Sequence, residues 1–127
     1  MVFARRTFLV AGTYGLLALL PMYFLEGRIG RDSPPPVTHP EFFYGFLGVA
    51  VAWQVAFLVI ARDPVRFRPL MLPAVLEKAS FGLPAVALWL GDRLAAPMLA
   101  AGLIDLTLGV LFVLAFLRTP ASRPGPP

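Results

Sequence analysis

Residues 70–90 read LMLPAVLEKASFGLPAVALWL, an almost wholly apolar run in which Glu77 and Lys78 stand side by side. A helix of about 20 apolar residues is long enough to cross a hydrocarbon core of ~30 Å. Three further runs of similar length and character occupy residues 7–25, 42–61 and 97–117. Because lipid cannot satisfy open backbone polar groups, such runs cross a bilayer as helices. The sequence therefore predicts an all-α fold, a four-transmembrane-helix bundle.

The composition favours one membrane domain over a soluble one. Of the 127 residues, 58% are hydrophobic, and the mean hydropathy is +0.77. A soluble domain has roughly 45–50% apolar residues, so one of this length could not bury so much apolar surface. We expect a transmembrane domain over residues 1–118 and a disordered, proline-rich tail over residues 119–127.

The arginines predict how this bundle is oriented. Because each run crosses the membrane, the start of the first run, the connection between the second and third runs and the end of the fourth lie on the same side. The arginines on that side are Arg5, Arg6, Arg62, Arg66, Arg68, Arg118 and Arg123. The other side carries only Arg28, Arg31 and Arg93, which nearby acidic residues offset. The positive-inside rule then places both termini in the cytoplasm, in a multi-pass protein of the bacterial inner membrane. The net charge of +4 is explained by orientation and contact with membrane lipids, so no nucleic-acid partner is expected.

The first run begins like an export signal. Residues 5–10, RRTFLV, resemble a twin-arginine motif, but residues 21–26 read PMYFLE where a cleavage site with small residues would stand. We therefore expect an uncleaved first span.

The longest connection between runs, residues 26–40, contains three consecutive prolines, which favour an extended segment over a helix. After it, Thr38 and Glu41 match the Ser/Thr-x-x-Glu capping box, which gives Glu41 a structural role at the start of the second helix. His39 is the single histidine and the chain has no cysteine, so disulfides, cysteine chemistry and a metal site are not expected.

Polar residues fall at similar depth in all four predicted helices, namely Tyr14, Gln54, Glu77, Lys78 and Asp105. At a rise of 1.5 Å per residue they lie roughly 10–18 Å from the cytoplasmic ends of their helices. A charged side chain at the centre of a span costs about 2.5–3.5 kcal/mol, so we expect these groups to face one another inside the bundle. Lys78 is expected to pair with Asp105. It is not expected to pair with Glu77, because adjacent helix residues point about 100° apart.

Small residues predict where the helices approach closely. Gly102, Asp105 and Gly109 share one face of the fourth helix, where another helix could pack. In the third helix, Pro84 removes the usual partner of the Ser80 carbonyl, and a kink there would open a small cavity. In the second helix, a stripe of small residues points roughly opposite Gln54 and could contact another subunit; it comprises Gly45, Gly48, Ala52 and Ala56.

Three stretches resemble the DoxX-like group of small bacterial four-helix membrane proteins: HPEFFYGFLG (39–48), LPAVLEKASFG (72–82) and GLIDLTLGVLFVLAFLR (102–118). The resemblance implies a four-helix bundle and, as for some members of that group, an association with quinone-linked redox enzymes. The chain is more distantly similar to the sterol-isomerase and sterol-sensor four-helix fold, whose members use acidic groups in the bundle to bind a cationic or carbocation-like ligand. That similarity would assign this role to Glu77 and Asp105.

These observations support three hypotheses for function. In the first, the protein binds an apolar ligand such as an isoprenoid, quinone or sterol-like lipid, as a binding protein or as a redox-linked or isomerase-like protein. Glu77 and Asp105 would contact its polar end, Lys78 would keep Asp105 charged, and Tyr14 and Gln54 would orient it. No catalytic residue is assigned, and no cofactor is indicated apart from a quinone as a candidate ligand.

In the second hypothesis, the chain is a non-enzymatic assembly or accessory subunit that docks on a larger membrane complex through its small-residue faces, at Gly48 and Gly109. The third, transport, would require a homo-oligomer, because four helices rarely enclose a pathway alone.

Overall fold

The computed structural model of the protein describes residues 2–32 and 34–121, and this part of the chain is helical without strands. Its elements in chain order are α1 (Val2–Leu19), the 3-10 turn η1 (Leu20–Phe24), α2 (Glu26–Asp32), α3 (Pro40–Arg62), the 3-10 turn η2 (Arg68–Leu70), α4 (Met71–Leu90) and α5 (Ala96–Arg118). Four segments are long and apolar enough to cross a membrane: Val2–Phe24, Pro40–Arg62, Arg68–Leu90 and Ala96–Arg118. They confirm the predicted all-α fold with four long apolar helices.

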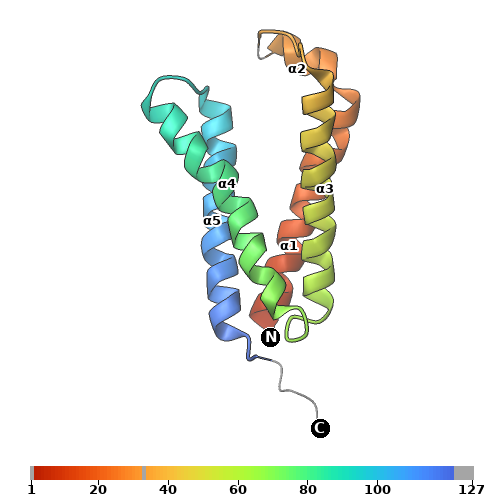
Figure 1. Ribbon diagram of the computed structural model, residues 1–127, viewed down its shortest axis with the longest axis vertical. Coiled ribbons are helices and arrows are strands. Elements are labelled where there is room, and N and C mark those ends of the chain that lie inside the picture. The colour runs from red at the N-terminus through yellow and green to blue at the C-terminus, as the bar shows by residue number, and fades with distance from the viewer. Residues whose placement is uncertain (1, 33, 122–127) are drawn as a thin grey trace.

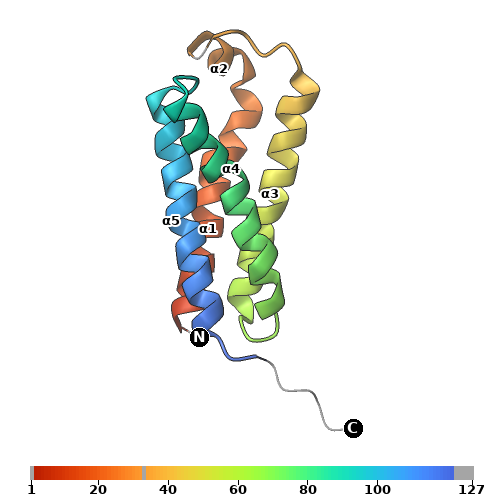
Figure 2. The ribbon, with the colours of Figure 1, turned by 60° about the vertical axis from the view of Figure 1, so that its left-hand side comes forward.

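The four long helices are arranged as two antiparallel pairs (Figures 1 and 2). α1 packs along α3, and α4 packs along α5, whereas α3 and α4 touch only slightly. The start of α1, the α3–α4 connection and the end of α5 lie together at one end, called the base here (Figure 1). The short α2 and the α4–α5 connection lie at the opposite end, called the far end, towards which the two pairs diverge.

An aromatic cluster at the base holds the two pairs together. Phe8 of α1 stacks on Phe112 of α5 with ring centroids 4.2 Å apart, and Phe57 of α3 meets Phe112 edge-on at 4.9 Å. All three rings are fully buried. The surrounding core consists of Ala4, Ala11, Ile60, Ala61, Met71, Ala74 and Ala115. The largest buried side chains of both pairs thus meet in one core cluster at the base.

Glycines bring the helices of each pair close together. A methyl group on Gly12 would lie 2.8 Å from the backbone oxygen of Gln54, so α1 and α3 are nearly in backbone contact there. Between α4 and α5, a methyl group on Gly102 would lie 2.6 Å from the Cβ of Ala85. This confirms the predicted close approach at the small face of α5, and it shows that the neighbouring helix is α4.

Arginines add polar contacts at the base. The Nε of Arg68 donates a hydrogen bond to the Phe116 carbonyl at 3.1 Å, and its guanidinium group lies 3.7 Å from the centre of the Phe116 ring. The guanidinium of Arg118 lies 4.7 Å from the centre of the Phe3 ring. Arg68 therefore caps a free carbonyl at the C-terminal end of α5, where positive charge is favourable.

The connection at the far end differs from its prediction. The helix α2 over Glu26–Asp32 was not predicted; its Arg28 and Asp32 form an i,i+4 ion pair at 3.4 Å. The predicted capping box was wrong. The N-cap of α3 is His39 and Pro40 is the first helical residue, so Thr38 lies one residue before the cap and Glu41 falls at the second helical position, where a capping box needs the third. Glu41 Oε1 instead lies 3.0 Å from His39 Nδ1.

Thr119, the first residue of the predicted disordered tail, packs against the end of α5. Thr119 is buried, and both its backbone N–H and its hydroxyl donate hydrogen bonds to the Ala115 carbonyl, at 3.0 and 2.7 Å. Residues 122–127, which carry the rest of that prediction, lie outside the described residues.

Candidate functional site

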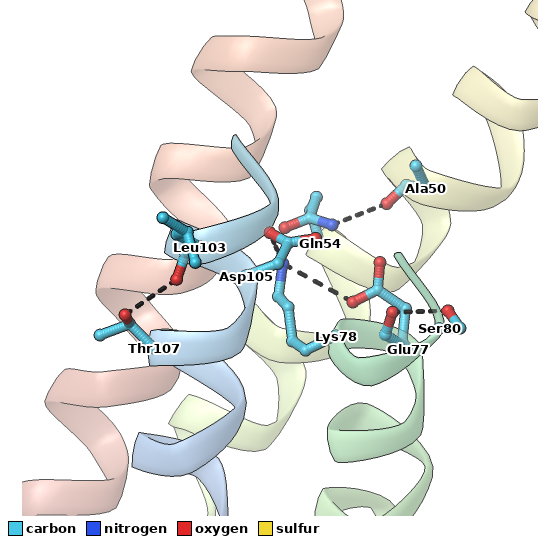
Figure 3. A network of polar contacts seen from close by, with 8 residues as sticks. All are labelled: Ala50, Gln54, Glu77, Lys78, Ser80, Leu103, Asp105 and Thr107. Carbon is cyan, nitrogen blue, oxygen red and sulfur yellow. Dashed lines mark hydrogen bonds and ion pairs between the residues drawn. The ribbon is translucent and has the colours of Figure 1, made fainter. Parts of the chain in front are cut away.

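Three charged side chains meet between α4 and α5 (Figure 3). The ammonium of Lys78 lies 3.3 Å from Asp105 Oδ1, to which it donates a hydrogen bond, and 3.6 Å from Glu77 Oε2. Lys78 is only 3% exposed, and its neighbours Glu77 and Asp105 are mostly buried. The pair between Lys78 and Asp105 is confirmed. The expectation that Glu77 and Lys78 do not pair was wrong, because the long lysine stem carries its charge to the carboxylate although the two Cβ atoms diverge.

Close packing of α4 on α5 is what places Lys78 beside Asp105. A methyl group on Gly109 would lie 3.4 Å from the Cβ of Lys78, so this glycine leaves room for the stem of the lysine. On its other side, the ammonium lies 5.2 Å from the centre of the Phe57 ring on α3, a cation–π contact. Lys78 therefore connects the α4–α5 pair to the top of the aromatic cluster.

Gln54 brings α3 into the same region and is 2% exposed. Its Nε2 donates a hydrogen bond to the Ala50 carbonyl at 3.0 Å, which fixes the orientation of the amide, because the flipped amide would set two oxygens against each other. The amide oxygen rests on Gly15 of α1, where the methyl group of any larger residue would overlap it. Gly15 thus makes room for the Gln54 side chain in the core.

A cavity of about 250 Å³ lies between the two pairs and is lined by all five of the predicted site residues. Its remaining walls are mostly apolar: Ala18, Leu19, Met22, Phe46, Ala50, Phe81, Met98 and Ala101. The four long helices each contribute to it, as expected from the shared depth of the polar residues. Tyr14 is the least enclosed of the five at 42% exposed, so it lies at the rim of the cavity.

A second hollow, a groove of about 420 Å³, runs between α3 and α4. It shares Phe46, Ala50, Glu77 and Phe81 with the cavity, so the two spaces adjoin at Glu77. Trp53 and Ser80 are among its other lining residues. The Ser80 hydroxyl donates a hydrogen bond to the Glu77 carbonyl at 2.7 Å, within an α4 that is continuous through Pro84. The groove thus opens beside Glu77, between helices of different pairs.

The buried polar groups of the cavity, Gln54, Glu77, Lys78 and Asp105, offer more acceptors than donors. One ammonium faces two carboxylates, and the Gln54 N–H group already has the Ala50 carbonyl as its acceptor. Among the described residues, buried Gln54 Oε1 and Glu77 Oε2 have no hydrogen-bond partner. Buried polar atoms normally do have one, so these two exceptions call for an explanation, and a ligand that donates a hydrogen bond is one.

Sequence reasoning missed the glycines of α1 and the apolar walls of the cavity. A signal for the glycines was present in the sequence. Ala4, Phe8, Ala11 and Gly15 recur at three- and four-residue spacing, so three of the four residues on this helix face are small. The apolar walls, such as Met22 and Met98, gave no such signal, because apolar residues fill every part of these helices.

Known proteins do not extend this description. No family model matches the chain, and no curated protein or solved structure is significantly similar to it. Within the described residues, no group of three or more His, Asp or Glu side chains is placed to hold a metal ion. The function must therefore be inferred from the cavity itself.

Proposed function

We propose that the protein is a multi-pass protein of the bacterial inner membrane that binds an apolar ligand with a polar end in the cavity between its helix pairs. Candidate ligands are an isoprenoid, a quinone or a sterol-like lipid. Glu77, Lys78 and Asp105 would contact the polar end, while Gln54 and Tyr14 would orient it. Binding is proposed without an assigned reaction.

The observation that carries this proposal is the convergence of three charged side chains on a cavity with otherwise apolar walls. In lipid, two acids and a lysine would cost on the order of 8–10 kcal/mol if they faced the acyl chains. Hydrogen bonds between membrane helices contribute only about 0.6 kcal/mol on average. Helix association alone is therefore a weak reason for the protein to carry these three charged residues. An ionisable group inside a membrane domain is by default a candidate functional group.

The arrangement of the arginines supports the proposed orientation. Arg62, Arg66, Arg68 and Arg118 belong to the base, where the chain also begins and the described part ends (Figure 1). If the base faces the cytoplasm, these arginines follow the positive-inside rule and meet the anionic head groups of the inner leaflet. Both termini would then be cytoplasmic.

Native mass spectrometry of the protein released from mild detergent tests the binding proposal. A defined lipid or quinone mass should remain on the wild type and be lost from the Glu77→Gln/Asp105→Asn double variant. Asp92→Asn is a matched control, since Asp92 is exposed in the α4–α5 connection at a positive φ of 56° that asparagine tolerates. Equal retention by all three proteins would contradict a role for the cavity carboxylates.

A second function, that of an accessory subunit, is favoured by one face of α3. Gly45, Gly48 and Ala52 are exposed there, and a methyl group on Gly45 would meet no atom within 4 Å. Gly109, the other residue predicted to dock on a partner, is instead buried against Lys78 and cannot serve this role. Loss of a stoichiometric partner on Gly48→Leu, with the cavity ligand retained, would favour this function over ligand binding.

A further inference from the structure

The hydrogen-bonding state of the cavity restricts what its ligand can be. The buried donors have acceptors: the Lys78 ammonium faces Asp105, Glu77 and the Phe57 ring, and the Gln54 amide nitrogen donates to the Ala50 carbonyl. The buried atoms left over are acceptors, Gln54 Oε1 and Glu77 Oε2, neither of which has a hydrogen-bond partner among residues 2–32 and 34–121. The Tyr14 hydroxyl is a further donor, but it stands at the exposed rim of the cavity.

A polar ligand end that donates a hydrogen bond would satisfy one of these buried oxygens. At the buried end of the cavity, a ligand end that only accepts, such as a ketone, an aldehyde or a quinone carbonyl, would meet donors that already have acceptors and would set oxygen against oxygen. Tyr14 could donate to it only at the rim, away from the buried oxygens. Leaving a buried polar atom unpaired is unfavourable, so the two ligand types should differ in affinity.

The space beyond the cavity indicates where the apolar body of such a ligand would lie. The groove between α3 and α4 adjoins the cavity at Phe46, Ala50, Glu77 and Phe81. Apart from Glu77 and Ser80, its walls are apolar, and they include Trp53 and Leu76. A molecule with its polar end at Gln54 and Glu77 could therefore extend sideways between the two helix pairs without meeting another charge.

We infer that the ligand is a hydroxyl-ended amphiphile, whose hydroxyl group donates to Gln54 Oε1 or Glu77 Oε2 while its apolar body occupies the groove between α3 and α4. This inference rests on the proposed binding function. It goes beyond it by selecting alcohols, among them the reduced form of a quinone, over their carbonyl counterparts.

The test compares matched probe pairs that differ only in the oxidation state of the polar end. Suitable pairs are farnesol and farnesal, decylubiquinol and decylubiquinone, and cholesterol and cholestenone. Affinities are measured by native mass spectrometry of the full chain titrated with each probe in nanodiscs, and tryptophan emission of the same samples reports separately where the probe lies. The Trp89→Phe background leaves Trp53, in the groove, as the single tryptophan.

We expect the hydroxyl member of at least one pair to bind about tenfold more tightly than its carbonyl counterpart, the value of one buried hydrogen bond. Its binding should change the emission of Trp53. The preference should shrink in Gln54→Met, which keeps the side-chain length and removes one acceptor.

Each other outcome is informative. Equal affinities within every pair, or tighter binding of the carbonyl member, would overturn the inference and leave the binding function standing. Hydroxyl preference without a change in Trp53 emission would overturn the placement of the apolar body in the groove. Binding of no probe from any pair would contradict the proposed function and the inference together.

Discussion

The Lys78 ammonium stands between two carboxylates, 3.3 Å from Asp105 and 3.6 Å from Glu77, and no other lysine occurs in the chain. Lys78→Met would leave both carboxylates without their cation, so we expect destabilisation of about 3–5 kcal/mol. Reversible unfolding in mixed detergent micelles measures this loss. The control is Asp32→Asn, which breaks the exposed pair with Arg28 and should cost less than about 1 kcal/mol. Equal losses of unfolding free energy in the two variants would show that the buried cluster stabilises the protein no more than an exposed ion pair does.

Gly15 and Gly45 provide a matched test of the packing around Gln54. A methyl group on Gly15 would overlap the Gln54 amide, whereas one on Gly45 would meet nothing within 4 Å. We expect Gly15→Ala to destabilise the fold by about 1–3 kcal/mol through overpacking. Gly45→Ala should be neutral or slightly stabilising, because alanine favours the helix. The same unfolding assay decides, and a neutral Gly15→Ala would contradict the close contact between α1 and α3.

Arg68 is expected to contribute more to stability than Arg66, although both are charged residues of one connection. Arg68 bonds the Phe116 carbonyl and lies over the Phe116 ring, while Arg66 is exposed. Arg68→Ala should cost about 1–2 kcal/mol, from the lost hydrogen bond at the helix end and the lost ring contact. Arg66→Ala removes the same charge and should cost little. A larger effect of Arg66→Ala would argue that net charge at the base, and not these contacts, is what stabilises it.

The absence of cysteine allows the proposed orientation to be tested with single introduced thiols. Ala95→Cys reports on the α4–α5 connection at the far end, and Ala121→Cys on the base; both alanines are exposed. In intact spheroplasts, a membrane-impermeant maleimide should label the first variant and reach the second only after permeabilisation. The reverse pattern would place the base, and with it both termini, outside.

The fold could be predicted from sequence because its main determinant is local. Four apolar runs of spanning length define four helices without any knowledge of their neighbours. Which helices pair was harder to predict, since it depends on glycine contacts such as Gly12 against the Gln54 backbone and Gly102 against Ala85. These contacts need the relative rotation of two helices, which a single sequence does not supply.

The candidate site was predictable in its members and less so in its geometry. Depth along the helices was enough to group Gln54, Lys78 and Asp105, and the structure places them around one cavity. The contact between Glu77 and Lys78 was missed because the prediction followed Cβ directions and ignored the reach of a flexible lysine stem. Likewise, the capping box failed because a shift of one residue in the start of α3 changed which side chains could meet.

The aromatic cluster of Phe8, Phe57 and Phe112 lies at the base, whereas towards the far end the two helix pairs diverge (Figure 1). This distribution implies that the molecule does not open uniformly. Backbone amides near the base should exchange with deuterium only on global unfolding, while those of the far halves of α3 and α4 should exchange through smaller local openings. The walls of the cavity would then belong to the less stable half of the protein, and a bound molecule would slow exchange there first.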